Sequence, residues 1–333
     1  MVQNRGLVAK QAGPLSDVLV IANVPKPYPG KDEVLVRVRA AAINPIDWKQ
    51  AIDGFLVQSW PAQLGFDLSG IVEEVGAGIT EFAVGDEVFA NPAGAGFAEY
   101  VALPLSKIYK KPASISFEEA ATLGVGVYTA VAAFYHDQGL KLHLPSEAHK
   151  FDKPEWVLIT GGATSVGVYA IQLAAKSGYK VITTASKKNE EYVKSLGASA
   201  VVDYTLPIPT QLSTIQSTTS NSLRYAIDLV DGVETSDLAA AALNPSLNPT
   251  LINLSYFGPQ EVPEGVTARP MASLMISSGV QEIIVKEVVP LLEKGALQLN
   301  RVHHLDGGFE GLKEGLRISS EGKVGGAKLV ASL

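Results

Sequence analysis

Residues 156–167 read W-V-L-I-T-G-G-A-T-S-V-G. The apolar run Trp156–Thr160 leads straight into a glycine-rich turn and then into a stretch with the composition of a helix. Glycine lets a backbone approach a phosphate, and the free N–H groups at a helix start attract its negative charge. The stretch therefore predicts a phosphate-binding turn with contacts at Ala163, Thr164, Ser165 and Val166. A tight connection that binds nothing is the alternative interpretation.

Strands and helices alternate along the chain after this turn. We predict strands at Lys180–Ala185, Ala200–Tyr204, Arg224–Val230 and Thr250–Ser255, and helices at Val166–Ser177, Glu190–Leu196 and Glu234–Leu243. Such alternation is typical of a parallel sheet covered by helices on both faces, a doubly wound Rossmann domain. In that setting the turn is expected to bind a dinucleotide. The Ser/Thr-rich stretch Leu212–Asn221 is predicted to be an exposed loop.

The tip of the second predicted strand indicates which dinucleotide binds. NAD-binding folds usually place an acid there, whereas this chain continues with Ser186, Lys187, Lys188 and Asn189. Lysines and hydroxyl groups attract a 2′-phosphate, so we predict NADPH as the cofactor. Two alternatives stay open: Ser186 or Asn189 caps the next helix, and the lysines are ordinary surface charge. Tyr204 either flanks the adenosine or packs in the core.

The flanking thirds of the chain have a different character. Short strand-like runs at Glu33–Arg39, Leu68–Val75, Glu87–Ala90 and Phe97–Leu103, bounded by turn residues, suggest a β barrel or sandwich. A long helix is predicted at Phe117–Tyr135. Near the end of the chain we predict helices at Val280–Lys294 and Phe309–Ser319, and strands at Leu297–Leu305 and Lys328–Leu333. This last segment is expected to pack on the first domain.

Composition excludes several classes of function. A chain of 333 residues suggests two domains, and the net charge of −7 is a poor match to nucleic acid. There are no cysteines, which excludes disulfides, thiolate nucleophiles and cysteine-bound zinc. No apolar stretch has the length of a membrane span or of a signal peptide core. We expect no membrane partner and a cytoplasmic location.

Several segments, taken in their order along the chain, resemble the medium-chain dehydrogenase/reductase family. They are Ala42–Lys49, Gly65–Gly76, Phe82–Val88, Gly96–Tyr100 and Gly161–Gly167. Two more, Gly307–Leu316 and Gly322–Val330, resemble its fungal branch of trans-acting enoyl reductases of polyketide synthases and zinc-binding-dehydrogenase-like oxidoreductases. The resemblance implies an α/β protein with two domains: a GroES-like, β-rich catalytic domain from residues 1–122 and 268–333, and a Rossmann domain at 123–267.

The chain departs from the zinc-dependent members of that family. Those carry a cysteine near the position of Asn44 and Gly-His-Glu where this chain has Gly65, Phe66 and Asp67. An amide and a phenyl ring cannot replace a thiolate and an imidazole on zinc, so no metal is predicted. Without that Lewis acid, reduction of an activated C=C bond fits better than alcohol oxidation.

The resemblance also implies site residues. Asn44, Pro45, Ile46, Asp47, Trp48 and Lys49 correspond to the active-site turn, and Lys49 and Thr129 are the expected catalytic pair. Leu251, Ile252, Val324 and Gly325 complete the expected cofactor contacts. Structural alternatives remain for both catalytic candidates: the turn is simply a helix start beside Trp48, and the Thr129 hydroxyl bonds its own helix backbone. Gly124 and Gly126 either open the pocket or serve packing.

These observations together predict an NADPH-dependent, zinc-independent reductase. It would transfer hydride to the C=C bond of an α,β-unsaturated carbonyl, with an enone, enal or quinone as its small-molecule substrate. A quinone or aldehyde reductase of the same family is one alternative. A non-catalytic NADPH-binding docking partner of a polyketide synthase is another. Water, Tyr128 or a lysine could supply the proton, and the chain is expected to be a monomer or homodimer.

Overall fold

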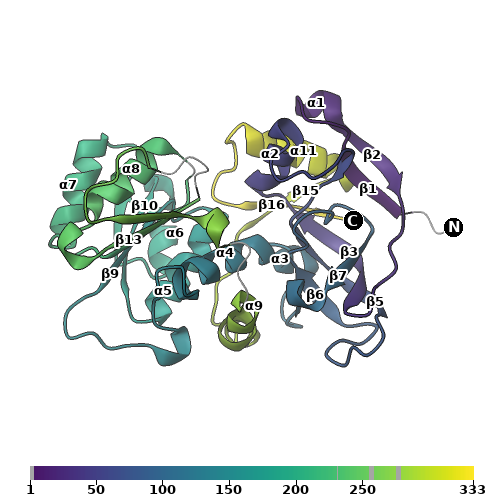
Figure 1. Ribbon diagram of the computed structural model, residues 1–333, viewed down its shortest axis with the longest axis horizontal. Helices are drawn as coiled ribbons and strands as arrows, with labels where there is room; N and C mark the ends of the chain where they lie inside the picture. The colour runs from purple at the N-terminus through teal and green to yellow at the C-terminus, as the bar shows by residue number, and fades with distance from the viewer. Residues whose placement is uncertain (1–3, 231, 255–258, 275–278) are drawn as a thin grey trace. The chain divides into compact units, whose positions relative to one another are not determined.

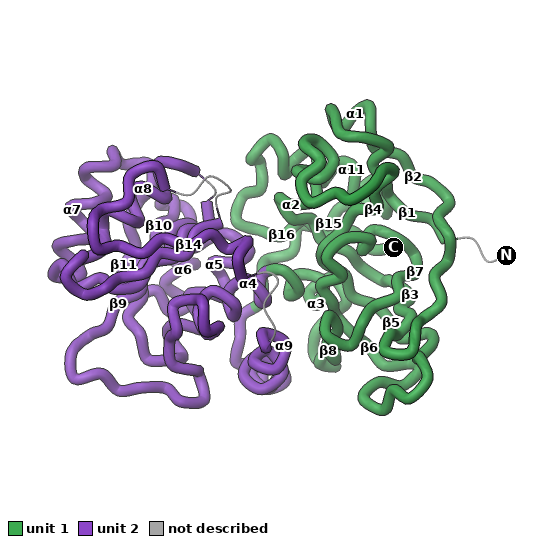
Figure 2. The backbone as a smooth tube through the Cα atoms, in the orientation of Figure 1, with its two compact units in different colours: residues 1–125, 299–333 green, residues 126–298 purple. Residues whose placement is uncertain are grey.

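The computed structural model describes residues 4–230, 232–254, 259–274 and 279–333. The chain forms two compact units (Figure 2). Unit 1 comprises Met1–Val125 and Leu299–Leu333, and unit 2 comprises Gly126–Gln298. Unit 1 is therefore assembled from two parts of the chain that are far apart in sequence.

Unit 1 contains two β sheets (Figure 1). The larger has seven strands in the order β15-β16-β3-β5-β6-β8, with β7 paired to β3, and the smaller has the order β2-β1-β4. The strands are β1 Asn4–Ala9, β2 Leu19–Val24, β3 Glu33–Ala42, β4 Ala62–Gln63, β5 Asp67–Val75, β6 Glu87–Ala90, β7 Tyr100–Pro104, β8 Ile108–Lys110, β15 Val302–Leu305 and β16 Lys328–Ser332. The helices are α1 Leu15–Val18, α2 Pro45–Asp53, η1 Leu105–Lys107, α3 Phe117–Ala120 and α11 Phe309–Ser320.

Strand β3 is the centre of the larger sheet. Val34, Val36 and Val38 are buried, while Arg37 and Arg39 are exposed, as the predicted alternation requires. Strand β16 pairs with the other end of β3, where Val330 lies opposite Ala42. This pairing brings residues from the two distant parts of the chain into one sheet.

Unit 2 is a doubly wound domain. Its six strands pair in parallel in the order β11-β10-β9-β12-β13-β14, so the chain winds outward from β9 in both directions. The strands are β9 Trp156–Thr160, β10 Lys180–Ala185, β11 Ala200–Asp203, β12 Tyr225–Asp228, β13 Thr250–Asn253 and β14 Thr267–Pro270. The helices are α4 Gly124–Tyr135, which begins in unit 1, η2 Pro145–Glu147, α5 Ser165–Lys176, η3 Lys187–Asn189, α6 Glu190–Ser195, α7 Ile208–Thr218, α8 Val233–Ala242, η4 Pro245–Leu247, η5 Met271–Ser273, α9 Val280–Ile283, η6 Ile284–Val288 and α10 Val289–Glu293. The predicted fold class is confirmed, and in such sheets ligands bind outside the carboxyl ends of the strands.

The prediction of a loop at Leu212–Asn221 was wrong, because helix α7 covers most of that stretch. Ile215 is fully buried there against the sheet. The hydroxyls that suggested a loop instead bond to the helix's own carbonyls, as Thr214 Oγ1 does to Thr210 O at 2.8 Å. Serine and threonine can remain in a helix in this way, which composition alone does not show.

The segment 268–298 belongs to unit 2, whereas the sequence assigns it to the first domain. Strand β14 extends the parallel sheet by pairing with β13. Gln172 of α5 also holds the chain near Gln298, accepting from its N–H at 2.7 Å and donating to its carbonyl at 2.8 Å. Backbone pairing, which leaves little trace in a short polar segment, decides this assignment.

We predict that the core of unit 2 carries much of that unit's stability. Leu158 of β9 is fully buried beside Ile182, Val202 and Ala226, so Leu158→Ala should lower the free energy of unfolding by about 2–5 kcal/mol. Leu247→Ala is the matched control, because Leu247 is 38% exposed and should cost about 0.5 kcal/mol or less. Urea unfolding of both variants measures the difference, and equal losses would contradict the packing described here.

Candidate active site

The glycine-rich turn of unit 2 is held by backbone and hydroxyl contacts. Gly161 has a φ of +74°, and its N–H donates to Thr184 Oγ1 at 2.9 Å. The Thr164 hydroxyl accepts from Gly167 N–H at 3.1 Å and so caps α5. A Cβ on Gly167 would lie 2.4 Å from Gly161 O, so only glycine fits where the helix meets the turn. Ala163, Thr164, Ser165 and Val166 are all partly exposed around the start of α5.

The tip of β10 carries no carboxylate. Ser186 and Asn189 are half-buried, whereas Lys187 and Lys188 are exposed. Residues Lys187–Asn189 form the short turn η3. Neither the Ser186 nor the Asn189 side chain caps the helix that follows. The acids around this tip are Glu190 at the start of α6 and Asp203 at the end of β11. The pKa of Asp203 is lowered chiefly by hydrogen bonds from Thr205 and also by the charge of Lys187.

The other sequence-predicted contacts of unit 2 differ in exposure. Tyr204, directly after β11, is 55% exposed, which argues against a core role. Leu251 and Ile252 are fully buried inside β13, so their side chains do not reach an open surface.

A buried carboxylate that the sequence reasoning missed lies at the end of β12. Asp228 is fully buried and accepts from the hydroxyls of Thr160, Thr235 (3.1 Å) and Ser236 (2.5 Å). Thr160 is the last residue of β9, immediately before the glycine-rich turn. Asp228 therefore links the end of β9 to β12 and to the start of α8. These hydrogen bonds hold the strand end from which the glycine-rich turn begins. An acid at the end of a buried strand was the available signal.

Helix α4 holds the second catalytic candidate. Thr129 is 6% exposed within this helix. Burial raises the pKa of its neighbour Tyr128, which stays protonated at neutral pH. Gly126 serves packing, because a Cβ there would lie 2.9 Å from the Tyr169 ring of α5.

In unit 1 the predicted active-site turn begins at a buried polar cluster. Lys328 of β16 donates to Asn44 Oδ1 at 2.5 Å and forms an ion pair with Asp67 Oδ2 at 2.9 Å. Asn44 Nδ2 donates to the same Asp67 oxygen at 2.9 Å. We call Asn44, Asp67 and Lys328 the lysine cluster. Asp67 and Lys328 were not among the predicted site residues; an acid and a lysine inside apolar strand sequences were the available signals.

The lysine cluster also explains why the helix predicted at Phe117–Tyr135 is split into α3 and α4. Val125 N–H, at the start of α4, donates to Asp67 Oδ1 at 2.6 Å. A Cβ on Gly124 would lie 2.3 Å from that oxygen, so Gly124 allows this close approach. The new helix start supplies a backbone N–H to a buried carboxylate.

The rest of the turn forms the first half of α2. Asn44 N–H donates to Asp47 Oδ2 at 2.6 Å, and Pro45 occupies the first helical position. Lys49 is half-buried with its Nζ 5.6 Å from the Trp48 ring centroid, and Ile46 is also partly exposed. Lys49 belongs to unit 1 and Thr129 to unit 2.

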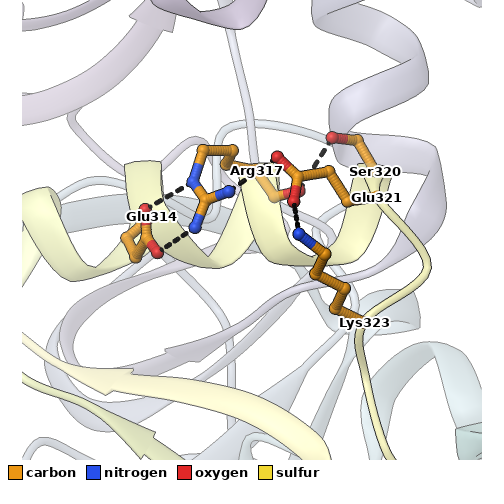
Figure 3. Close-up of polar contacts among 5 residues, drawn as sticks. All are labelled: Glu314, Arg317, Ser320, Glu321 and Lys323. Atoms are coloured by element: carbon orange, nitrogen blue, oxygen red, sulfur yellow. Dashed lines mark hydrogen bonds and ion pairs between the residues drawn. The ribbon is translucent and has the colours of Figure 1, made fainter.

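Helix α11 supports α2 and leads to Val324 and Gly325. A Cβ on Gly315 would lie 2.9 Å from Ile43, directly before Asn44. At the other end of the helix, Arg317 pairs with Glu314 and Glu321 at 2.6 Å, and Glu321 pairs with Lys323 at 2.6 Å (Figure 3). This exposed network links α11 to the segment before Val324, although ion pairs on a solvent-exposed surface contribute little to stability.

Comparison with known proteins identifies the family. The alcohol dehydrogenase GroES-like domain matches residues 30–143. The enoyl reductase component of the lovastatin nonaketide synthase of Aspergillus terreus is 33% identical over 347 residues, covering 95% of this chain and 93% of that protein. The zinc-type alcohol dehydrogenase-like protein of Schizosaccharomyces pombe is 31% identical over 340 residues, covering 95% and 97%. The chain therefore belongs to the medium-chain dehydrogenase/reductase family.

Within that family the chain is an oxidoreductase whose relatives include fungal enoyl reductases. Its fold also matches the quinone oxidoreductase of Coxiella burnetii, with a TM-score of 0.77, 25% identity and complete coverage of both chains. In the described part of the chain, no helix is both long and apolar enough to cross a lipid bilayer.

The residues at the family's zinc position do not fit that metal. Phe66 offers no donor atom, and the ammonium group of Lys328 lies between the oxygens of Asn44 and Asp67. Within the described residues, no group of three or more histidines and carboxylates could hold a metal ion. The donor set instead surrounds a cation that belongs to the chain itself.

Asp47 gives unit 1 a predicted pH dependence. Burial, assisted by the charge of Asp67, raises the pKa of the Asp47 carboxyl to about 8, although Asn44 N–H and Lys328 oppose the shift. In the unfolded chain this pKa is about 3.9, so between about pH 4 and 8 only the folded protein holds the proton. Folding stability should therefore fall as pH rises through this window, by up to about 1.4 kcal/mol per pH unit.

Asp47→Asn removes this titration and keeps an acceptor for Asn44 N–H. We expect the free energy of unfolding of the variant, relative to the wild type, to increase steadily from pH 5 to pH 8 in urea titrations. Asp53→Asn, an exposed change on the same helix, should show a constant difference. A constant difference for Asp47→Asn as well would contradict the raised pKa.

Proposed function

We propose that this protein is an NADPH-dependent, zinc-independent reductase of activated C=C bonds in α,β-unsaturated carbonyl compounds. The observation that carries the proposal is the seating of the Lys328 ammonium between Asn44 and Asp67. An ammonium buried there cannot polarise a substrate oxygen as a metal ion in an open site does, so this site lacks that means of stabilising the alkoxide formed in alcohol oxidation. The enoyl reductase relatives favour C=C reduction.

The preference for NADPH is supported by the tip of β10. Lys187 and Lys188 are exposed there, and the side chains of Ser186 and Asn189 do not cap α6. These groups are available to a 2′-phosphate, whose charge of about −1.5 to −2 a carboxylate at the same place would repel. The turn at Gly161–Gly167 and the start of α5 would hold the pyrophosphate through backbone N–H groups.

When bound, NADPH supplies the hydride that adds to the β-carbon of the substrate. Negative charge then develops on the carbonyl oxygen, and hydrogen-bond donors aimed at that oxygen lower the barrier. The proposed donors are the Lys49 ammonium and the Thr129 hydroxyl. Tyr128, kept protonated by burial, Lys49 or water would provide the proton for the α-carbon.

A quinone reductase is the second candidate function, favoured by the similarity to the quinone oxidoreductase of Coxiella burnetii. The same donors would serve it, because a quinone is also an α,β-unsaturated carbonyl compound. The relative that is a component of a nonaketide synthase raises the further alternative of a docking partner, which would bind NADPH without turning over free small molecules. The oligomeric state proposed for any of these is monomer or homodimer.

We predict that the two lysines of η3 determine cofactor preference. Lys187→Ala combined with Lys188→Ala should lower the NADPH/NADH ratio of kcat/KM by about 10–100-fold, because charge-assisted hydrogen bonds contribute about 1.5–3 kcal/mol. The control is Lys150→Ala combined with Lys153→Ala, which removes the same charge from exposed positions on the connector before β9. An unchanged ratio in the η3 variant would show that NADPH is not selected at this strand tip.

We predict that the Thr129 hydroxyl acts on the reacting oxygen. Thr129→Val, which keeps the side-chain shape, should lower kcat with an enone by about 10²-fold, while Thr129→Ser should keep most of the activity. NADPH oxidation is measured with an enone, a quinone and a simple aldehyde for each variant. Turnover of the aldehyde alone by the wild type would rule out C=C reduction, and no turnover at all would favour the docking partner.

A further inference from the structure

The lysine cluster does not fit zinc, but its buried charges suggest another role. We propose that Lys328 is a positioning residue for the reaction: its buried ammonium serves as a built-in cation that fixes Asn44, and through Asn44 the helix start that carries Lys49. The inference rests on the proposed function, since it explains how that site is held.

The lysine cluster is buried. The Lys328 and Asp67 side chains are 3% and 0% exposed, so both charges are shielded from bulk solvent. Lys328 Nζ contacts Asn44 Oδ1 at 2.5 Å and Asp67 Oδ2 at 2.9 Å, and Asn44 Nδ2 returns to Asp67 Oδ2 at 2.9 Å. Each of the three side chains contacts the other two.

Lys328 determines the orientation of the Asn44 amide. The amide oxygen faces a cation and the amide nitrogen faces a carboxylate, and a flip would place like polarities together. Without the ammonium, the oxygen of Asn44 would lose its cationic donor, and the negative charge of Asp67 would lack its cation.

Helix α2 connects Asn44 to the proposed catalytic residue Lys49. Asn44 is the last residue before α2, and its N–H holds the first turn of that helix through Asp47 Oδ2 at 2.6 Å. Lys49 is on the next turn. A shift or rotation of Asn44 therefore changes the direction in which α2 starts and displaces the Lys49 side chain, whose placement should affect the rate more than the binding of substrate.

The lysine cluster joins several segments of unit 1 that are far apart in the sequence. Lys328 comes from β16, Asp67 from β5, and the second Asp67 oxygen accepts from Val125 N–H at the start of α4 at 2.6 Å. These segments surround the beginning of α2, so a single cation coordinates the placement of all of them.

The test compares Lys328→Met with Lys110→Met. Lys110 forms an exposed ion pair with Asp86 at 3.1 Å in the same unit, so its loss removes a lysine–aspartate pair without touching the cluster. In assays run well below the melting temperature of the variant, we expect Lys328→Met to lower kcat by about 10²-fold. The KM for substrate should change by less than about threefold. Lys110→Met should leave both constants within about twofold.

Chemical rescue separates positioning from a general loss of structure. In Lys328→Ala, n-propylammonium should restore at least part of the lost kcat and raise the melting temperature, because it replaces the missing ammonium group. Tetramethylammonium at equal ionic strength cannot donate a hydrogen bond and should do neither. The wild type and Lys110→Ala should respond to neither cation.

The outcomes distinguish this inference from the proposed function. If the wild type reduces no enone, quinone or aldehyde while n-propylammonium still stabilises Lys328→Ala selectively, the proposed function fails and the built-in cation stands. If the wild type is active and Lys328→Met keeps its kcat, the positioning role is wrong. Equal rescue by both ammonium ions would likewise overturn it, since ionic strength alone would then be responsible.

Discussion

Inside unit 1 a lysine, an aspartate and an asparagine form a buried, hydrogen-bonded group. Removing charges from water is expensive, and the interaction between them offsets that penalty only when every donor and acceptor is satisfied. Breaking such a pair by removing one partner typically costs about 3–5 kcal/mol, because the other charge remains buried. The arrangement of β5, β16 and the start of α2 therefore depends on all three residues together.

The proposed site draws on both backbone and side-chain groups. In unit 2 the proposed phosphate contacts are the turn after β9 and the N–H groups at the start of α5, and the Lys187, Lys188 and Thr129 side chains are the other proposed contacts. The buried Asp228 side chain supports the end of β9 that leads into that turn. In unit 1 the proposed contacts are side chains of the turn at Asn44–Lys49, which begins at the lysine cluster. A site of this kind tolerates changes at its surface better than changes in the buried groups behind it.

Much of this organisation could be predicted from sequence, and the exceptions have physical reasons. The run W-V-L-I-T-G-G identifies the doubly wound unit because strand, turn and helix are consecutive, and the family resemblance supplies the candidate turn at Asn44–Lys49. The lysine cluster is not visible in the same way, since Asn44 and Lys328 are 284 residues apart and only pairing of β16 with β3 brings them together. Helix α7 was missed because hydroxyl side chains can bond to their own helix as easily as to a turn.

The assembly of unit 1 from two distant segments has a consequence for biosynthesis. On the ribosome, Asn44 and Asp67 emerge early, whereas Lys328 follows only after the whole of unit 2 has been translated. Unit 2, a continuous segment, can fold while the nascent chain is still growing. Until β16 has been synthesised, the partly formed unit 1 contains an aspartate without its cation and a β3 edge without its β16 partner. The nascent polypeptide therefore has most need of binding by chaperones during this interval.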